Sequence, residues 1–391
     1  MKEKFLRELA DIQTGPFGSQ LHKEDYVADG TPIVTVEHLG NKMFSEQNLP
    51  RVSNTDKNRL KKYVLKQGDI VFSRVGSVDR CSYVDQKHDG WMFSGRCLRV
   101  RPTSEIDSEY LYYYFCLEET KQFVRNIAFG ATMPSINTKL LGEVVVTFPE
   151  LEQQKRISGI LSAIDSKIEV NQKINDNLLE QMQALYKSWF VDYRPFGGVM
   201  PTSWTQTGIY SLANIIYGAP FASKQFNTEG NGRPIIRIRD LKDQQFATYT
   251  TEVHPKGYLL HPGDIVVGMD GEFRPYIWGN DEAWLNQRVC VFENKRPNGK
   301  AFLYFTIKPL LFAIEQTQVA TTVIHIGKKD FDAFEIMLPD TELLDAFDVI
   351  TTPMVEQIVS NSIENKRLAI MRDALLPKLM SGEINVSNIQ L

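Results

Sequence analysis

The segment that decides the fold is RISGILSAIDSKIEVNQKINDNLLEQMQALYKSW, which covers residues 156–189. Its apolar residues recur in alternating steps of four and three, which is the a/d pattern of a coiled-coil helix. Two asparagines interrupt this otherwise apolar series. The series runs through Ile157, Leu161, Ile164, Ile168, Asn171, Asn175, Leu178, Met182, Leu185 and Trp189.

The same series returns 190 residues later, with asparagines at the same two positions. Polar residues at a/d positions weaken a coiled coil but fix its register. We therefore predict that Asn171 and Asn175 meet Asn361 and Asn365 across a pair of helices. Pro353 lies early in the second series and predicts a kink or a restart of that helix. The second series runs through Phe347, Thr351, Met354, Ile358, Asn361, Asn365, Leu368, Arg372, Leu375 and Leu379.

The repeat extends beyond the helices. The heptapeptide LKQGDIV at residues 65–71 returns as LHPGDIV at residues 260–266. Further matches occur in the same order along the chain, which indicates a duplicated sequence. Asp69 and Asp264 within these peptides are interpreted as turn caps. The further matches pair residues 9–12 with 212–215, 31–39 with 233–241, and 148–149 with 338–339.

Each half is predicted to consist of a globular domain followed by a helix. Short runs of β-branched residues bounded by turn residues predict strands, and the apolar face of residues 108–127 predicts a helix. The fold class is therefore α+β, with two mixed α/β domains, two long helices and an internal pseudo-twofold repeat. The predicted boundaries are 1–149 for domain 1, 150–192 for the first helix, 193–338 for domain 2 and 339–391 for the second helix. The expected strands lie at 33–36, 70–72, 144–147, 235–238, 265–267 and 289–292.

The direction of the helix pair follows from the connection. Domain 2 starts where the first helix ends and stops where the second helix begins. If each domain packs against the start of its own helix, antiparallel helices hold the two domains at opposite ends of a rod. The alternative is that each helix merely covers the core of its own domain.

Composition excludes several classes of protein. The 391 residues include 44 Lys and Arg and 48 Asp and Glu, for a net charge of −4. No stretch approaches the ~20 consecutive apolar residues of a membrane span, and no secretory signal is visible. The four cysteines form no CxxC pair, which favours free thiols and a cytoplasmic location.

The motifs of common enzymes are absent from the sequence. There is no GxxxxGK[ST], GxGxxG, HExxH or GxSxG motif, and the histidines show no metal-ligand spacing. Neither a catalytic site, nor a metal site, nor a cofactor of its own is therefore predicted. Asp264 with Glu293 and Lys295 leaves a magnesium-dependent nuclease open as an alternative. A scaffold that binds proteins through its helices is the other alternative.

A duplicated chain without catalytic motifs suggests a double binder. Arginine is well shaped for bidentate contacts with guanine or phosphate, although each candidate could equally be a solvated loop charge. Arg96 and Arg288 align at an offset of 192. The candidate DNA-binding residues are Ser73, Arg74, Arg80, Lys87, Arg96, Arg99, Arg237, Arg239, Arg274 and Arg288.

The negative charge belongs to the helices. Residues 1–149 hold 20 basic and 19 acidic residues, and residues 193–338 hold 15 and 14, so each domain has a net charge of +1. The segments 150–192 and 339–391 together have a net charge of −6. The acidity of the whole chain is therefore no argument against DNA binding by the domains.

Three segments resemble a known family. The stretches FPELEQQKRI at residues 148–157, LYKSWFVDYRPF at residues 185–196 and LLPKLMSGEI at residues 375–384 are similar to conserved regions of type I restriction–modification specificity subunits. The resemblance spans the whole chain. The recognition domains of this family are variable, so no base-contacting residue can be carried over to this sequence.

The resemblance implies a function and partners. Each recognition domain would read one half of a bipartite, asymmetric target in double-stranded DNA, and the antiparallel helices would set the spacer between the halves. Two modification subunits that use S-adenosylmethionine would dock on the chain and methylate adenine. Restriction subunits that use ATP and magnesium are a further partner that the family allows. The specificity subunit itself would be non-catalytic.

Overall fold

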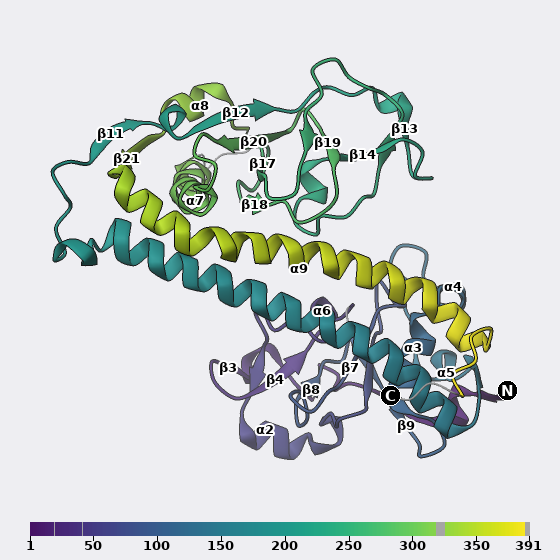
Figure 1. Ribbon diagram of the computed structural model, residues 1–391. Coiled ribbons are helices and arrows are strands. Elements are labelled where there is room, and N and C mark those ends of the chain that lie inside the picture. Colours follow the sequence, from purple (N-terminus) through teal and green to yellow (C-terminus); the bar gives the residue numbers. More distant parts are fainter. Residues whose placement is uncertain (19, 41, 318–324, 388–391) are drawn as a thin grey trace. The chain divides into compact units, whose positions relative to one another are not determined.

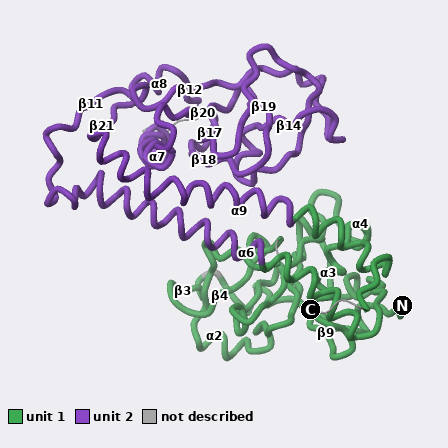
Figure 2. The backbone as a smooth tube through the Cα atoms, in the orientation of Figure 1, with its two compact units in different colours: residues 1–166, 369–391 green, residues 167–368 purple. Residues whose placement is uncertain are grey.

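The computed structural model describes the chain apart from residues 19, 41, 318–324 and 388–391 (Figure 1). The chain divides into two compact units, shown in two colours in Figure 2. Unit 1 comprises residues 1–166 and 369–391, and unit 2 comprises residues 167–368. None of the described helices is long and apolar enough to span a membrane.

Unit 1 contains domain 1, in which two four-stranded sheets lie beside a two-stranded sheet. The strand orders are β2-β9-β6-β7, β3-β5-β4-β8 and β1-β10. The strands are β1 (Lys2–Phe5), β2 (Ala10–Thr14), β3 (Tyr26–Val27), β4 (Thr31–Val34), β5 (Arg51–Val52), β6 (Ile70–Ser73), β7 (Cys81–Tyr83), β8 (Met92–Phe93), β9 (Cys97–Pro102) and β10 (Val145–Phe148). The helices are α1 (Leu6–Leu9), α2 (Asn54–Arg59), α3 (Ser108–Cys116), α4 (Glu118–Ile127) and α5 (Thr138–Leu141), with 3₁₀ turns at Lys23–Asp25, Val36–His38 and Lys61–Tyr63.

Unit 2 contains domain 2, with the strand orders β12-β20-β17-β18, β13-β15-β14-β19-β16 and β11-β21. The strands are β11 (Thr205–Gly208), β12 (Ala213–Tyr217), β13 (Phe226–Asn227), β14 (Arg233–Ile236), β15 (Tyr249–Thr250), β16 (Leu259–Leu260), β17 (Ile265–Gly268), β18 (Pro275–Ile277), β19 (Ala283–Leu285), β20 (Val289–Asn294) and β21 (Glu335–Leu338). The helices are α7 (Lys300–Thr317) and α8 (Lys328–Asp332), with 3₁₀ turns at Arg194–Phe196, Ile209–Ser211, Ser223–Gln225 and Ile238–Asp240.

The two domains repeat the same topology. In each, the first sheet is antiparallel, and Ile12 pairs with Val100 as Ile215 pairs with Phe292. In each, the second sheet contains one parallel pair, β4 with β8 and β14 with β19. Equivalent pairings between strands far apart in sequence confirm the internal duplication that the short matches predicted.

The GDIV peptides form the same turn in both domains. Asp69 accepts a hydrogen bond from the backbone N–H of Lys66 at 2.8 Å, and Asp264 accepts one from His261 at 2.8 Å. The glycine before each aspartate has a positive φ, +89° at Gly68 and +86° at Gly263, which a side chain would disfavour. Both aspartates therefore cap turns, as the sequence indicated.

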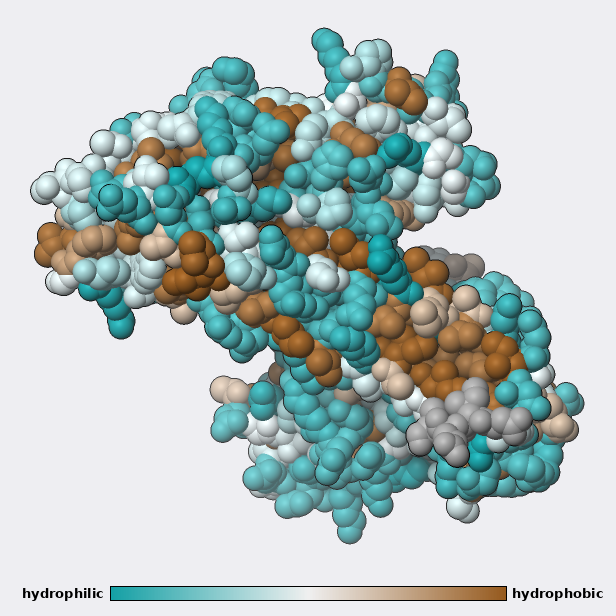
Figure 3. Space-filling view, in the orientation of Figure 1, coloured by the Kyte–Doolittle hydropathy of each residue, from teal (hydrophilic) through white to brown (hydrophobic). Residues whose placement is uncertain are grey.

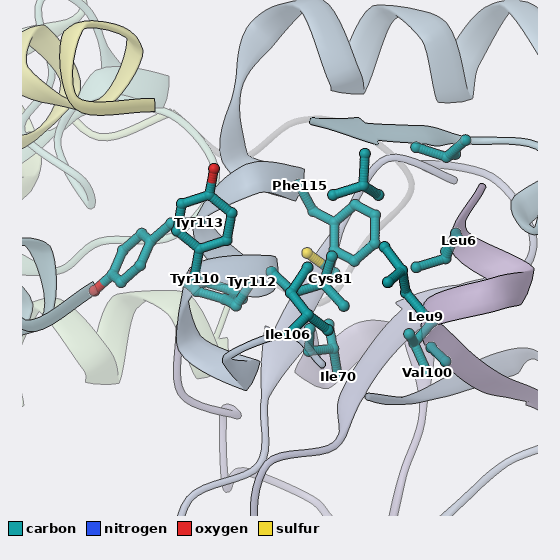
Figure 4. Close-up of a cluster of buried hydrophobic side chains, with 14 of the residues drawn as sticks. Leu6, Leu9, Ile70, Cys81, Val100, Ile106, Tyr110, Tyr112, Tyr113 and Phe115 are labelled. Atoms are coloured by element: carbon teal, nitrogen blue, oxygen red, sulfur yellow. The ribbon is translucent and has the colours of Figure 1, made fainter. Parts of the chain in front are cut away.

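Two long helices complete the units. Helix α6 (Leu151–Tyr186) continues as a π-helical turn over Lys187–Val191, and α9 covers Thr341–Ser381. The core of domain 1 includes Ile157 and Leu161 from the start of α6 together with Leu379 from the end of α9. Figure 4 shows part of this core, including Phe115 and Ile70. The Phe115 ring packs edge-on against Phe72, with 4.7 Å between the ring centroids.

The core of domain 2 mirrors this arrangement. It includes Leu344 and Phe347 from the start of α9 and Met182 from the end of α6. Phe190 of the π-helical turn packs edge-on against Phe347, with 5.0 Å between their ring centroids. In each unit the start of one helix thus lies beside the end of the other. The helices pair antiparallel within both units, as predicted.

One helix prediction needs correction, and a second holds in part. The helix expected over residues 108–127 breaks at Leu117, whose ψ of 134° is extended, and the acidic Glu118 and Glu119 then occupy the first turn of α4. Of the two outcomes predicted at Pro353, a kink or a restart, the restart does not occur, because α9 is continuous over Thr341–Ser381. The proline has no N–H to donate to the Val349 carbonyl, and Val349, at 76% exposure, lies on the solvent side of the helix. Figure 1 shows that α9 bends within its first third, which agrees with the predicted kink.

Candidate DNA interface

Four segments of domain 1 meet beyond one end of its first sheet. We call them loop cluster 1, which comprises residues 15–17, 74–76, 94–96 and 129–135. The N–H of Arg74 donates to the carbonyl of Arg96 at 2.8 Å, and the N–H of Gly76 donates to the carbonyl of Pro134 at 2.8 Å. A Cβ on Gly15 would lie 2.1 Å from the Ser94 carbonyl oxygen, so only glycine allows these two backbones to cross.

Domain 2 builds the equivalent loop cluster 2 from residues 218–221, 269–271, 286–288 and 325. The N–H of Met269 donates to the carbonyl of Arg288 at 2.9 Å, as Arg74 does to Arg96. A Cβ on Gly218 would lie 2.1 Å from the Asn286 carbonyl oxygen, which repeats the close crossing of domain 1. The two arginines aligned by sequence therefore occupy the same backbone position in the two domains.

Loop cluster 1 is rich in exposed groups. Arg96 is exposed, and no side-chain hydrogen bond or ion pair is found for it in the part of the chain that the structure describes. Arg74 donates to the Gly95 carbonyl at 3.1 Å, and its guanidinium lies 5.5 Å from the ring centroid of Phe17. Exposed fractions of 54% for Phe17, 53% for Phe129 and 64% for Met133 leave apolar groups beside these cations. Such a surface can offer both hydrogen-bond donors and apolar contacts to base edges.

The other candidates of domain 1 are engaged within the domain. Ser73 and Arg99 are only 2% and 3% exposed, so neither side chain lies where a duplex could reach it. Ser73 donates to the Val75 carbonyl, and Arg99 bonds to Asp11, while burial lowers the pKa of Arg99. Arg80 donates to the Leu39 carbonyl and Lys87 pairs with Glu46. The structure thus does not bring these four residues together with Arg74 and Arg96 as one surface.

The candidate DNA-binding residues of domain 2 also do not form one surface. Arg237 pairs with Asp240 at 3.2 Å, and Arg239 lies 3.8 Å from the same carboxylate but is largely exposed. Arg274 forms a bidentate pair with Glu315, and this contact lowers the pKa of the Glu315 carboxyl. Only Arg288 lies in loop cluster 2.

Two residues of loop cluster 2 were missed by the sequence reasoning. Asp270 accepts from Arg288 and from His325, which approaches from a segment 55 residues away. The available signal was the position of Asp270, two residues after the strand that begins within the repeated GDIV peptide. A metal-site search over the described residues finds no group of three or more His, Cys, Asp or Glu, and Glu293 of the nuclease alternative bonds to Asn214.

The four asparagines of the helix series form one cluster. Asn171 donates to Asn365 Oδ1, and Asn361 donates to Asn175 Oδ1, both at 2.9 Å. Asn171 also donates to Glu364 at 2.7 Å. Asn171 and Asn361, which are equivalent in the repeat, are buried, with exposed fractions of 1% and 4%. The amides therefore meet across the helix pair as predicted, each with the non-equivalent asparagine of the other repeat.

Comparison with known proteins identifies the family. The family model of the type I restriction modification DNA specificity domain matches residues 1–180 and again 201–360. The chain belongs to this family. It is a DNA specificity subunit and not an enzyme, as the sequence predicted, and the scaffold and nuclease alternatives are not favoured.

Curated relatives cover most of the chain. The type I restriction enzyme MjaIX specificity subunit of Methanocaldococcus jannaschii is 26% identical over 317 residues, covering 74% of this chain and 72% of the relative. The HindI specificity subunit of Haemophilus influenzae is 24% identical, covering 83% of this chain and 88% of the relative. The solved structure of the type I restriction–modification S subunit from M. genitalium shares the fold, with a TM-score of 0.58 at 17% identity and coverage of 97% and 95%.

Proposed function

We propose that each domain reads one half of a bipartite, asymmetric DNA target through its loop cluster. The observation that carries this proposal is the equivalent placement of Arg96 and Arg288, each fixed through its carbonyl by a neighbouring loop. An arginine guanidinium can donate two hydrogen bonds to guanine O6 and N7 in the major groove. Two structurally equivalent but chemically different loop clusters would read two different half-sites.

The low net charge of the two domains suits a role in which they read bases and bind phosphates only weakly. Phosphate contacts supply most of the affinity of DNA-binding proteins, and base contacts supply the specificity. With a net charge of only +1 per predicted domain, each domain alone would bind DNA weakly. The helix pair would link two weakly binding domains. This linkage multiplies the affinity for DNA only when the spacing fits both half-sites. The helices would thereby set the spacer length.

The partners of the chain are proposed from the family. Two modification subunits would dock on the helices, bind S-adenosylmethionine and methylate adenine, and restriction subunits would add ATP- and magnesium-dependent cleavage. We assign no cofactor to this chain. Val170 and Ile174 lie one turn apart on α6 and are 50% and 41% exposed, and Figure 3 shows hydrophobic side chains at the surface along this helix. Such exposed apolar groups on a helix suit a protein partner.

The reading proposal is tested by exchanging one arginine at a time. Arg96→Ala and Arg288→Ala are expressed with the modification subunit, and methylated adenines are mapped across the host genome. Each variant should relax the sequence preference in one half of the motif by about tenfold at one base pair, because a bidentate contact is lost. Arg239→Ala, exposed but outside the loop clusters, is the control. Equal loss in both halves would show a nonspecific role for these arginines.

The docking proposal is tested with charge on α6. Val170→Asp combined with Ile174→Lys should weaken co-purification of the modification subunit at least tenfold, because charges would have to be buried in the contact. Val253→Asp serves as the control, since Val253 is 77% exposed in the loop between β15 and β16. Unchanged co-purification of the double variant would exclude this face of α6 as the docking surface.

A further inference from the structure

Three side chains of loop cluster 2 form a connected group. Asp270 accepts from Arg288 Nη1 with both carboxylate oxygens, at 3.1 and 3.0 Å, and from His325 Nδ1 at 2.6 Å. The Asp270 side chain is 20% exposed, whereas the Arg288 and His325 side chains are 53% and 50% exposed. The carboxylate thus lies at the base of the group, and the two partners extend from it into solvent.

The backbone fixes where these side chains start. Asp270 and His325 form a β-bridge, Ile326 N–H donates to the Met269 carbonyl at 2.9 Å, and Met269 N–H donates to the Arg288 carbonyl at 2.9 Å. Three segments far apart in the sequence therefore meet through main-chain bonds. The side-chain group rests on this framework and does not depend on one flexible loop.

The hydrogen bonds to Asp270 leave some donor and acceptor groups of Arg288 and His325 free. Asp270 takes up one terminal nitrogen of Arg288, so the remaining N–H groups of the guanidinium can still donate. When His325 Nδ1 donates to the carboxylate, Nε2 is left as an acceptor. Because the carboxylate balances the guanidinium charge, the pair is attracted less to phosphate but keeps its donors for base edges. Holding the arginine in advance also reduces the side-chain entropy that binding would cost.

Building on the proposed function, we propose that Asp270 is a positioning residue that presents Arg288 and His325 as one base-reading unit. Arg288 would donate to guanine O6 or N7, and His325 Nε2 would accept from an exocyclic amino group of a neighbouring base in the major groove. The half-site read by domain 2 therefore contains a guanine, and its recognition depends on the Asp270 carboxylate.

Domain 1 lacks this support at the equivalent positions. Val75 and Ser135 form the β-bridge that corresponds to the one between Asp270 and His325. Arg96 occupies the place of Arg288. The repeat thus supplies an internal reference, because one molecule carries a supported and an unsupported arginine.

The test uses the complete chain with its modification subunit and maps methylated adenines in genomic DNA. Asp270→Asn should relax the preference for guanine in one half of the motif about tenfold and leave the other half unchanged. Val75→Asn, at the equivalent site of domain 1, is the matched control and should leave the domain 2 half unchanged. A role limited to folding would lower methylation of all sequences uniformly, so uniform loss with an unchanged motif would overturn the proposal.

Two further variants separate the possible failures. If Arg288→Ala relaxes one half-site and Asp270→Asn does not, the positioning role is wrong while the reading function stands. If Arg288→Ala changes neither half, the proposed function of loop cluster 2 itself fails. Should Asp270→Asn abolish all methylation, His325→Ala gives the same readout at a half-exposed side chain. It should relax one base pair of the domain 2 half, and an unchanged motif would contradict the proposal.

Discussion

Asp69 and Asp264 cap the same turn in the two domains but have different second partners. Asp69 accepts from Nε and Nη2 of Arg101, both at 2.7 Å, whereas Asp264 accepts from the Tyr258 hydroxyl at 3.0 Å. In the first sheet of domain 2, Glu293 occupies the position equivalent to Arg101. Burial raises the pKa of the Asp264 carboxyl, and this effect outweighs the lowering by the His261 N–H, the Tyr258 hydroxyl and the Lys300 charge.

This pKa shift predicts how stability depends on pH. The folded-state pKa of Asp264 lies above its unfolded value, so the wild-type chain loses stability as the pH rises through the folded pKa. Asparagine does not titrate and can still accept from the His261 N–H. The melting temperature of Asp264→Asn minus that of the wild type should therefore be more positive at pH 7 than at pH 4.5. A difference that does not change with pH would contradict the shift.

Arg372 shows how one seam position can be charged in one unit and apolar in the other. Its Nη1 donates to Asp165 at 2.7 Å, and the Tyr113 hydroxyl donates to the other oxygen of that carboxylate at 2.5 Å. At the equivalent repeat positions of unit 2 stand Met182 and Val355, which are 1% and 4% exposed. The same helix geometry thus accepts either an ion pair or an apolar pair.

A double-mutant cycle tests this equivalence. Arg372→Met alone should destabilise unit 1 by about 2–3 kcal/mol, because it leaves the Asp165 side chain, which is 11% exposed, without a cation. Asp165→Val alone should cost less, because Arg372 keeps Asp373 as a partner. This range is below that of fully buried pairs, since the Arg372 side chain is 30% exposed. The double variant should lie within about 1 kcal/mol of the wild type. The free energy of unfolding is measured by chemical denaturation. If the losses of the two single variants add in the double variant, the two residues are not coupled.

At the scale of the helix pair, the asparagine cluster lowers the stability of the pair but fixes the register of the two helices. Asn171 and Asn361 are buried, and Asn171 Oδ1 is a buried acceptor for which no hydrogen bond is found within the described residues. Asn171→Leu combined with Asn361→Leu should raise the melting temperature by several degrees, because two buried amides are replaced by apolar side chains. Their partners Asn175 and Asn365 are partly exposed and can bind water.

The same variant should also lose its unique pairing. Without the amide contacts, other registers and intermolecular helix pairs become accessible. Cysteine cross-linking across the seam would detect shifted registers, and light scattering would detect oligomers. A single register and a monomeric chain in the double variant would show that the asparagines do not fix the pairing. Asn177→Leu, on the exposed face of α6, is a suitable control.

The sequence was most informative where a period or a repeat carried the signal. The heptad series predicted the helix pair, and the connection of domain 2 predicted its antiparallel direction. The break at Leu117 could not be predicted, because no Gly or Pro marks it, while α7 keeps Pro309 at the equivalent position without ending. Burial of Ser73 and Arg99 depends on sheet packing, and the meeting of Asp270 with His325 depends on a contact 55 residues apart. Neither feature produces a pattern in the local sequence.

At the scale of the whole molecule, each long helix has one part in unit 1 and the rest in unit 2. In unit 1, the Tyr113 hydroxyl of domain 1 donates to Asp165 of α6, and this carboxylate also accepts from Arg372 of α9. In unit 2, the asparagine cluster begins at Asn171 on α6 and ends at Asn365 on α9. The short helical segments between these positions are therefore where the proposed spacing function can be altered with least damage to either core.

Inserting one heptad into each of these segments tests the proposed spacing function. Seven residues between Asp165 and Asn171, and seven between Asn365 and Arg372, preserve the a/d series and lengthen each helix by about 10 Å. At about 3.4 Å per base pair, the preferred spacer should grow by roughly three base pairs while both half-site sequences stay unchanged. Inserting the heptad in one helix only is the control, since the asparagine contacts and the Asp165–Arg372 pair can then no longer form together, and it should abolish methylation. A two-helix insertion that methylates the original spacer would show that the helices do not set the spacing.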